Sequence, residues 1–79
     1  MGQRIQLKDM QTGQCGVVSD LGSEGREQLR LMEMGLLPGT KIRFVRRAPL
    51  GGPLEVEIRG FHLSLRAHEA EHIGVEVEQ

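Results

Sequence analysis

KIRFVRRAPLGGPLEVEI, residues 41–58, carries the clearest structural signal in the chain. Apolar and charged residues alternate at both of its ends, which is typical of β-strands that bury one face. A loop rich in proline and glycine lies between them, so the two strands are predicted to form an antiparallel hairpin. The predicted inward row comprises Ile42, Phe44, Arg46, Leu54, Val56 and Ile58. Glu55 and Glu57 then face the basic residues of the first strand and neutralise most of their charge.

Three further segments have the composition and period of strands. Residues 14–21 alternate after the Thr12-Gly13 turn, and residues 61–65 follow a tight turn at Arg59-Gly60. A short helical turn at His68 to His72 then precedes a final short strand at residues 75–77. The chain is therefore predicted to be mainly β.

One α-helix is predicted over residues 24–34, where the apolar period changes from that of a strand to that of a helix. Leu29, Met32 and Leu36 fall on one stripe, so Met32 is assigned to the core, while the place of Met34 is left open. Ser23 is expected to cap the first amides of the helix.

The end of this helix is strongly marked. Gly35 suits the left-handed position that follows a helix, and Leu36 is then placed to pack back on Leu31. The next four residues, Leu37-Pro38-Gly39-Thr40, have the composition of a type II turn. The helix is therefore expected to stop at Gly35 and the chain to turn into the hairpin.

The predicted fold class is a small SH3-like barrel of about five antiparallel strands, with one α-helix and a short helical turn near the C-terminus. One domain, residues 1–79, is expected, because so short a chain cannot supply two cores. A closed or nearly closed barrel is favoured because closure removes exposed strand edges. Such a small core leaves little room for a buried active site, which favours a binding module over an enzyme.

Composition argues against several classes of function. The net charge of −1 gives no overall field toward nucleic acid or an anionic membrane. Aromatic residues make up 3% of the chain, without tryptophan or tyrosine, so a platform for stacking bases is absent. No apolar run reaches the roughly 20 residues that cross a bilayer, and the start resembles no signal peptide, so a cytoplasmic protein without membrane insertion is expected. The single Cys15 is assigned to the core.

One motif points elsewhere. His68-Glu69-Ala70-Glu71-His72 matches H-E-x-x-H, in which two histidines bind zinc and the glutamate activates a water molecule. No third ligand is expected on a second helix, since Glu76 or Glu78 could supply an oxygen only by accident, and a small barrel offers no peptide cleft. A solvated polar turn is the preferred interpretation. A metal-binding or metal-sensing role for His68 and His72 stays open as the alternative.

Three ordered blocks of this sequence, with its opening, resemble the FeoA family. The blocks are Arg30 to Gly39, Arg47 to Pro53 and Gly60 to Arg66, and the opening matches are Leu7 to Met10 and Thr12-Gly13. The resemblance implies a small cytoplasmic protein with an SH3-like fold. It further implies a partner, the FeoB-type membrane permease for ferrous iron, which carries a cytoplasmic GTP-binding domain.

The expected function is therefore that of an accessory protein of ferrous iron uptake, which binds and modulates this permease at the inner face of the membrane. Arg26, Arg30, Pro49 and Leu50 are the predicted partner-binding residues. Leu50 lies at a loop tip where no core can shelter it, and the arginines form a like-charge pair one helical turn apart. No catalytic residue, metal ligand or cofactor is assigned, and the oligomeric state is left open.

Overall fold

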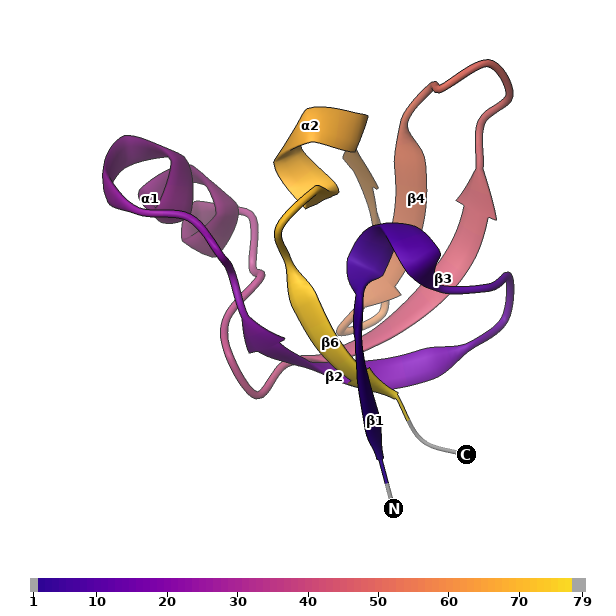
Figure 1. The fold of residues 1–79 in the computed structure, drawn as a ribbon, viewed down its shortest axis with the longest axis horizontal. Helices are drawn as coiled ribbons and strands as arrows, with labels where there is room; N and C mark the ends of the chain where they lie inside the picture. The colour runs from indigo at the N-terminus through magenta and orange to yellow at the C-terminus, as the bar shows by residue number, and fades with distance from the viewer. Residues whose placement is uncertain (1, 78–79) are drawn as a thin grey trace.

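The computed structural model describes residues 2–77. Its six antiparallel strands form one curled sheet in the order β1-β6-β2-β3-β4-β5 (Figure 1). The strands are β1 (Gln3–Gln6), β2 (Cys15–Asp20), β3 (Lys41–Arg47), β4 (Leu54–Ile58), β5 (Phe61–Leu65) and β6 (Gly74–Val77). A short 3-10 helix η1 (Leu7–Asp9) and two α-helices, α1 (Gly25–Glu33) and α2 (Ala67–Ala70), complete the fold.

The predicted fold class is confirmed, with one more strand than the sequence indicated. The additional strand is β1, which has a single apolar residue, Ile5, among its four. It pairs with β6 in the register Ile5 to Val75, so a partner distant in sequence makes it a strand. Within residues 2–77 no pairing joins β1 to β5. The sheet therefore curls into a barrel that stays open between these two edges.

The hairpin of β3 and β4 forms as predicted, with one correction. Ile42, Phe44 and all three apolar residues of β4 are buried, whereas Arg46 is exposed. The register shifts between Phe44 and Arg46, and such a bulge turns the following side chains to the other face. Arg46 therefore leaves the inward row and pairs with Glu55 at 2.8 Å.

The end of α1 is also as predicted. The amide of Gly35 donates to the Met32 carbonyl and the amide of Leu36 donates to the Leu31 carbonyl, which together make a Schellman motif. Gly35 has a φ of 103°, and both leucines are buried in the core. The type II turn follows, since the Thr40 amide donates to the Leu37 carbonyl at 2.9 Å and Gly39 has a φ of 93°.

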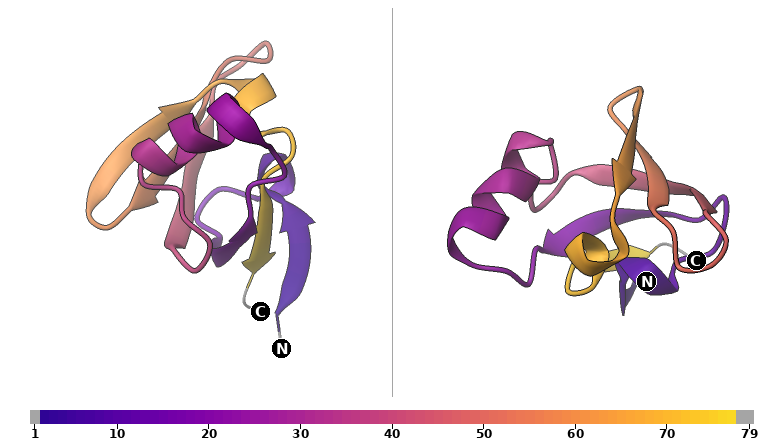
Figure 2. Two further views of the ribbon diagram at one scale, coloured as in Figure 1. Left: turned by 90° about the vertical axis from the view of Figure 1, so that its left-hand side faces the viewer. Right: turned by 90° about the horizontal axis from the view of Figure 1, so that it is seen from above.

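Three other expectations about side chains were wrong. Ser23 does not cap α1, because its hydroxyl donates to the Leu21 carbonyl and the residue at the cap position is Glu24. Met32 is exposed, as is Leu29, because α1 stands off the sheet and buries only Leu31 (Figure 2). A helical stripe marks an apolar face but does not fix how much of it another element covers.

The third of these expectations concerns Cys15, which is exposed rather than buried. The inner face of β2 instead carries Gly16 and Val18, both buried. A side chain at Gly16 would lie 2.7 Å from the backbone oxygen of Glu76, so only glycine fits there. Both faces of this strand carry small residues, so the sequence pattern did not show which face is buried.

No helix within residues 2–77 has the length and apolar character needed to span a bilayer.

Candidate functional site

The candidate site is one end of the barrel, which α1, α2 and the loop between β3 and β4 form together, at the top of Figure 1. Two hollows lie on it. The first, of about 540 Å³, separates α1 from α2, and the second, of about 460 Å³, separates α2 from the loop. The first is lined by Glu24, Arg26, Glu27, Arg30, Leu31, His68 and Glu69, and the second by Lys8, Arg47, Gly51, Gly52, Leu54, Ala67, His68 and Glu71. His68 lines both, and we call this surface the α2 face.

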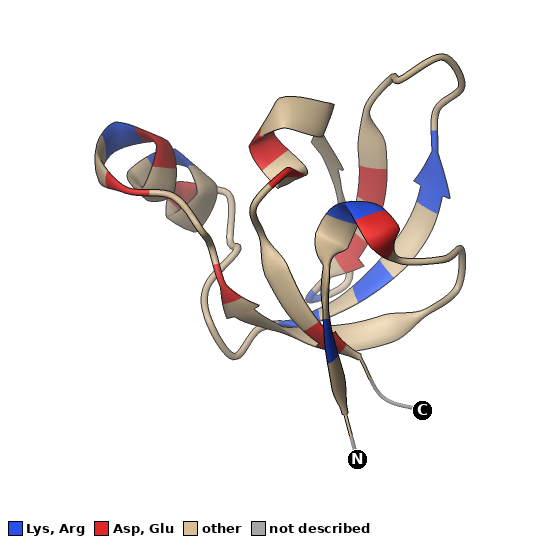
Figure 3. Cartoon of the chain, viewed as in Figure 1, with Lys and Arg blue, Asp and Glu red and all other residues tan. Residues whose placement is uncertain are grey.

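Both predicted arginines line the first hollow. Arg26 is exposed and has no ion pair within the described part of the chain. Arg30 lies 3.6 Å from the Glu69 carboxylate, which is longer than a hydrogen bond, and its side chain is 68% exposed. Acidic and basic residues mix along α1 (Figure 3), so this helix presents a charged rather than a purely basic surface.

The loop between β3 and β4 presents Leu50 to solvent. Leu50 is fully exposed, and Pro49 beside it is exposed as well. Leu50 and Gly51 both have positive φ, 60° and 72°, and the Gly52 amide donates to the Pro49 carbonyl at 3.3 Å. These angles define a tight turn of the type I′ class, in which a leucine is unusual because its side chain is strained there. The apolar tip is thus held in a costly conformation away from the core.

The structure therefore places the four predicted residues at opposite ends of one face rather than in one cluster. Arg26 and Arg30 border the first hollow, while Gly51 and Gly52 of the loop border the second. The shared residue, His68, lies between them on α2. Sequence reasoning treated His68 only as a possible metal ligand and missed this central position, which depends on where α2 packs.

The H-E-x-x-H run does not adopt the arrangement of a zinc protease. The two histidines are exposed, but α2 ends at Ala70, so His72 lies beyond it. Glu69 is only 7% exposed, which corrects the expectation of a fully solvated turn. Its Oε1 accepts a hydrogen bond of 2.9 Å from the Arg66 amide at the start of α2, a capping role that a glutamate at the third helical position commonly fills.

No group of three or more potential metal ligands occurs among residues 2–77. Glu76 belongs to β6 and faces outward, and Glu78 lies outside the described residues.

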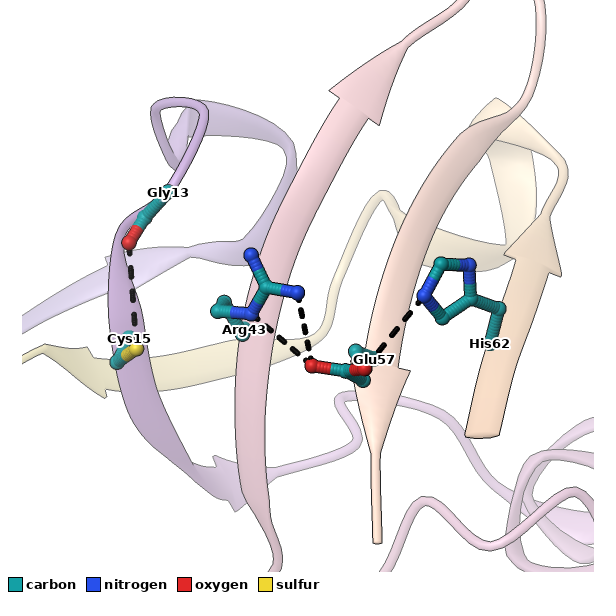
Figure 4. Close-up of polar contacts among 5 residues, drawn as sticks. All are labelled: Gly13, Cys15, Arg43, Glu57 and His62. Carbon is teal, nitrogen blue, oxygen red and sulfur yellow. Dashed lines mark hydrogen bonds and ion pairs between the residues drawn. The ribbon is translucent and has the colours of Figure 1, made fainter. Parts of the chain in front are cut away.

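A second polar feature runs across the outer face of the sheet (Figure 4). Cross-strand neighbours Cys15, Arg43, Glu57 and His62 form one row from β2 to β5. Arg43 donates to Oε1 of Glu57 through two nitrogens, at 3.0 and 2.8 Å, and His62 lies 3.5 Å from the other oxygen. The hydrogen bond and charge of Arg43 hold the pKa of Glu57 below its usual value. The predicted cross-strand neutralisation of the basic residues is thus confirmed for Arg43 and Arg46.

Comparison with known proteins settles the family. The FeoA domain family matches residues 5–77, which is nearly the whole described chain.

The chain belongs to the FeoA family.

Among the relatives of this FeoA-family chain is a fusion of Fe(2+) transport protein A with the Fe(2+) transporter FeoB in Porphyromonas gingivalis, 33% identical over 73 residues. The match covers 92% of this chain but only 9% of the fusion protein. The solution structure of an FeoA-like protein from Clostridium acetobutylicum is 34% identical with a TM-score of 0.86, covering all of this chain and 92% of the other. These matches place the SH3-like architecture within a family named for ferrous iron transport.

A third relative is the FeoA of Stenotrophomonas maltophilia, described as a prokaryotic SH3 domain protein and crystallised with zinc. It is 29% identical with a TM-score of 0.72, over 90% of this chain and 88% of that one. Its SH3-like description agrees with the fold of the present chain.

Proposed function

We propose that this FeoA-family chain is an accessory protein of ferrous iron uptake, which binds a FeoB-type permease and modulates its GTP-binding domain. The single observation that carries the proposal is the Porphyromonas gingivalis relative, in which the two components form one polypeptide. Covalent joining raises the effective concentration of two modules that act together. The chain acts in the cytoplasm and reaches the inner face of the membrane through this partner.

We further propose the α2 face as the contact surface. Leu50 offers a fully exposed apolar group, and the backbone of its loop is constrained by the turn between Pro49 and Gly52, which limits the entropy lost on binding. At the other end, Arg26 and the incompletely paired Arg30 remain available to carboxylates of the partner. The two anchors flank His68, so one partner surface that covers α2 contacts both.

The test is binding to a purified FeoB-type permease and, separately, to its GTP-binding domain. Leu50→Asp is expected to weaken binding by roughly tenfold or more, because it places a charge in a desolvated contact. Arg26→Glu with Arg30→Glu is expected to weaken it in a salt-dependent way and mainly through the association rate. The rate of GTP hydrolysis measured with and without the chain then reports modulation.

Matched controls separate this face from general effects of charge. Thr12→Asp adds the same charge at another exposed turn, and Lys41→Glu reverses an exposed charge on β3 that, like Arg26, has no ion pair within residues 2–77. Both controls are expected to bind like the unmodified chain. If the Leu50 and arginine variants are folded and bind as tightly as these controls, the contact surface lies elsewhere. If the unmodified chain itself binds neither permease nor domain, the proposed function is wrong.

A further inference from the structure

Strand β5 is a free edge of the sheet. It follows β4 through a two-residue turn at Arg59 and Gly60, whose φ values are 48° and 83°, and it pairs with β4 without any register shift. In such a hairpin the residues next to the turn exchange hydrogen bonds, and bonded and non-bonded pairs then alternate. Phe61, Leu63 and Leu65 therefore bond to β4. The amides and carbonyls of His62 and Ser64 point away from the sheet.

Nothing within residues 2–77 occupies this outer side of β5. Both His62 and Ser64 are exposed, and no backbone hydrogen bond outside the sheet involves residues 61–65. Proteins commonly protect an edge strand with proline, lysine, an inward charge or a bulge. Strand β5, with the sequence FHLSL, has none of these devices. The opposite edge differs, because β1 carries Arg4, which pairs with Asp20.

The inner side of the same edge is incompletely covered. Phe61 is 45% exposed and Leu63 is only partly buried, although both side chains point toward the interior of the barrel. β5 lies on the side of its hairpin that faces α1 (Figure 2), and a side chain added at Gly35 would come within 3.6 Å of the Phe61 ring. On α1, Met32 is 38% exposed. A further strand beside β5 would cover this apolar row and continue the curl of the barrel.

The charges around β5 indicate what kind of strand fits. Exposed Arg59 precedes β5 and exposed Arg66 follows it, and neither has an ion pair in the described part of the chain. The strand itself contains no carboxylate. Antiparallel pairing of β5 with a second copy would bring Arg59 of one chain toward Arg66 of the other at both ends, and such like-charge contacts are unfavourable. A segment with a carboxylate at each end would instead place opposite charges beside Arg59 and Arg66, which is electrostatically favourable.

We propose that the edge of β5 is a strand-addition site that takes an extended segment of another protein, with alternating apolar residues between flanking carboxylates. Main-chain hydrogen bonds to His62 and Ser64 supply affinity, and contacts of alternate side chains with Phe61 and Leu63 supply specificity. This site uses the outward edge of β5, Phe61 and Leu63 rather than Leu50, and it does not depend on the proposed role in iron uptake.

The test uses two blocked synthetic heptapeptides, EVTVTVE and KVTVTVK, titrated into the isotope-labelled full chain and followed by NMR. The acidic peptide is expected to shift the amide signals of His62 and Ser64 and to slow their hydrogen exchange. Its affinity is expected to exceed that of the basic peptide by roughly tenfold, with a difference that falls as salt rises.

Two variants and a control test whether binding uses the outward amides of β5 and the two flanking arginines. Ser64→Pro removes an outward amide without removing a bond to β4, so it is expected to abolish binding, whereas Ser64→Ala is expected to retain it. Arg59→Glu with Arg66→Glu leaves the backbone edge unchanged and is expected to reverse the preference between the two peptides. This second variant tests the site even if the proline variant fails to fold.

Three results would overturn the proposal. The first is that neither peptide shifts the β5 signals at millimolar concentration. The second is that shifts centre on β1 or on the α2 face. The third is that a folded Ser64→Pro variant binds the acidic peptide as well as Ser64→Ala does.

Discussion

Among single residues, Gly35 carries two constraints at once. Its φ of 103° lies in the left-handed region, and a side chain there would meet Ile58 Cδ1 at 3.1 Å. The position thus ends α1 and also lets the chain approach β4 closely. Either constraint alone favours glycine, and together they make this residue a point at which the helix is fixed to the barrel.

Replacement of Gly35 by valine is expected to destabilise the fold by more than about 1 kcal/mol. Backbone strain at the left-handed φ and the close contact with Ile58 both raise the free energy of the folded state. Gly39→Val is the matched control, because Gly39 also has a left-handed φ, of 93°, but open space around it. Chemical denaturation of both variants measures the difference. An unchanged midpoint for Gly35→Val, or equal losses for the two variants, would contradict the double constraint.

The lowered pKa of Glu57 predicts a specific dependence of stability on pH. Because Arg43 favours the carboxylate in the folded state, the stabilisation is present above the ordinary glutamate pKa of about 4.5 and is lost as the pH falls through the lower folded-state value. The unfolding free energies of the unmodified chain and the Glu57→Gln variant should therefore converge in acid. The effect is expected to be small because both side chains are partly exposed.

An Arg43→Gln background provides the control for this pH effect. Without the guanidinium, the change in stability caused by Glu57→Gln should lose most of its pH dependence. Urea denaturation measures the effect of Glu57→Gln on stability in both backgrounds, at a series of pH values between roughly 2 and 7. This range spans the ordinary carboxyl pKa. A difference that grows as the pH falls would show that folding raises the pKa of Glu57 instead of lowering it.

Among the elements, α2 illustrates how a very short helix is kept in place. It has four residues, too few to be stable alone, and Glu69 accepts the Arg66 amide at its start. The same carboxylate lies 3.6 Å from Arg30 of α1, across the first hollow. The candidate partner surface depends on this one buried acid.

Glu69→Ala is therefore expected to destabilise the fold by about 0.5–2 kcal/mol, the range of a lost helix cap. Glu71→Ala is the matched control, since Glu71 is exposed on the same turn and has no ion pair within residues 2–77. It is expected to change stability by less than about 0.5 kcal/mol. Thermal unfolding compares the two. Equal stability of both variants would mean that the bond to Arg66 does not hold α2.

Across the whole molecule, the distribution of acidic and histidine residues bears on metal binding. No three of these residues converge anywhere in residues 2–77, and most carboxylates near cations are already paired with them. Stable sites for zinc in proteins normally use three or four protein ligands. His68 within α2 and His72 beyond it are both exposed, and together they supply two ligands rather than three or four.

Titration of the chain with zinc and with ferrous ions is thus expected to show weak binding without a defined stoichiometry. The variant His68→Ala with His72→Ala should bind about as weakly as the unmodified chain. Isothermal titration calorimetry measures both. Tight binding of one ion per chain that disappears in the double variant would instead favour the metal-binding alternative over the accessory role.

The family and most of the fold were predictable because their signals are local. The strand period of residues 41–58 and the prolines and glycines that limit φ act within a few residues, and the FeoA resemblance uses the same stretches. Each candidate partner residue was predicted from features of its own short segment. Their arrangement around His68 was not predictable, because it depends on how α2 packs between α1 and the loop.

Local sequence thus accounts for the hairpin, the Schellman end of α1 and the exposed tip at Leu50, since each follows from backbone preferences and period over short distances. Long-range packing alone turned Cys15 outward, left Met32 exposed and brought β1 into the sheet. These outcomes escape a local pattern because burial and strand pairing depend on partners far away in the chain. Such a pattern shows that a residue can be buried, and the packing of distant elements determines whether it is.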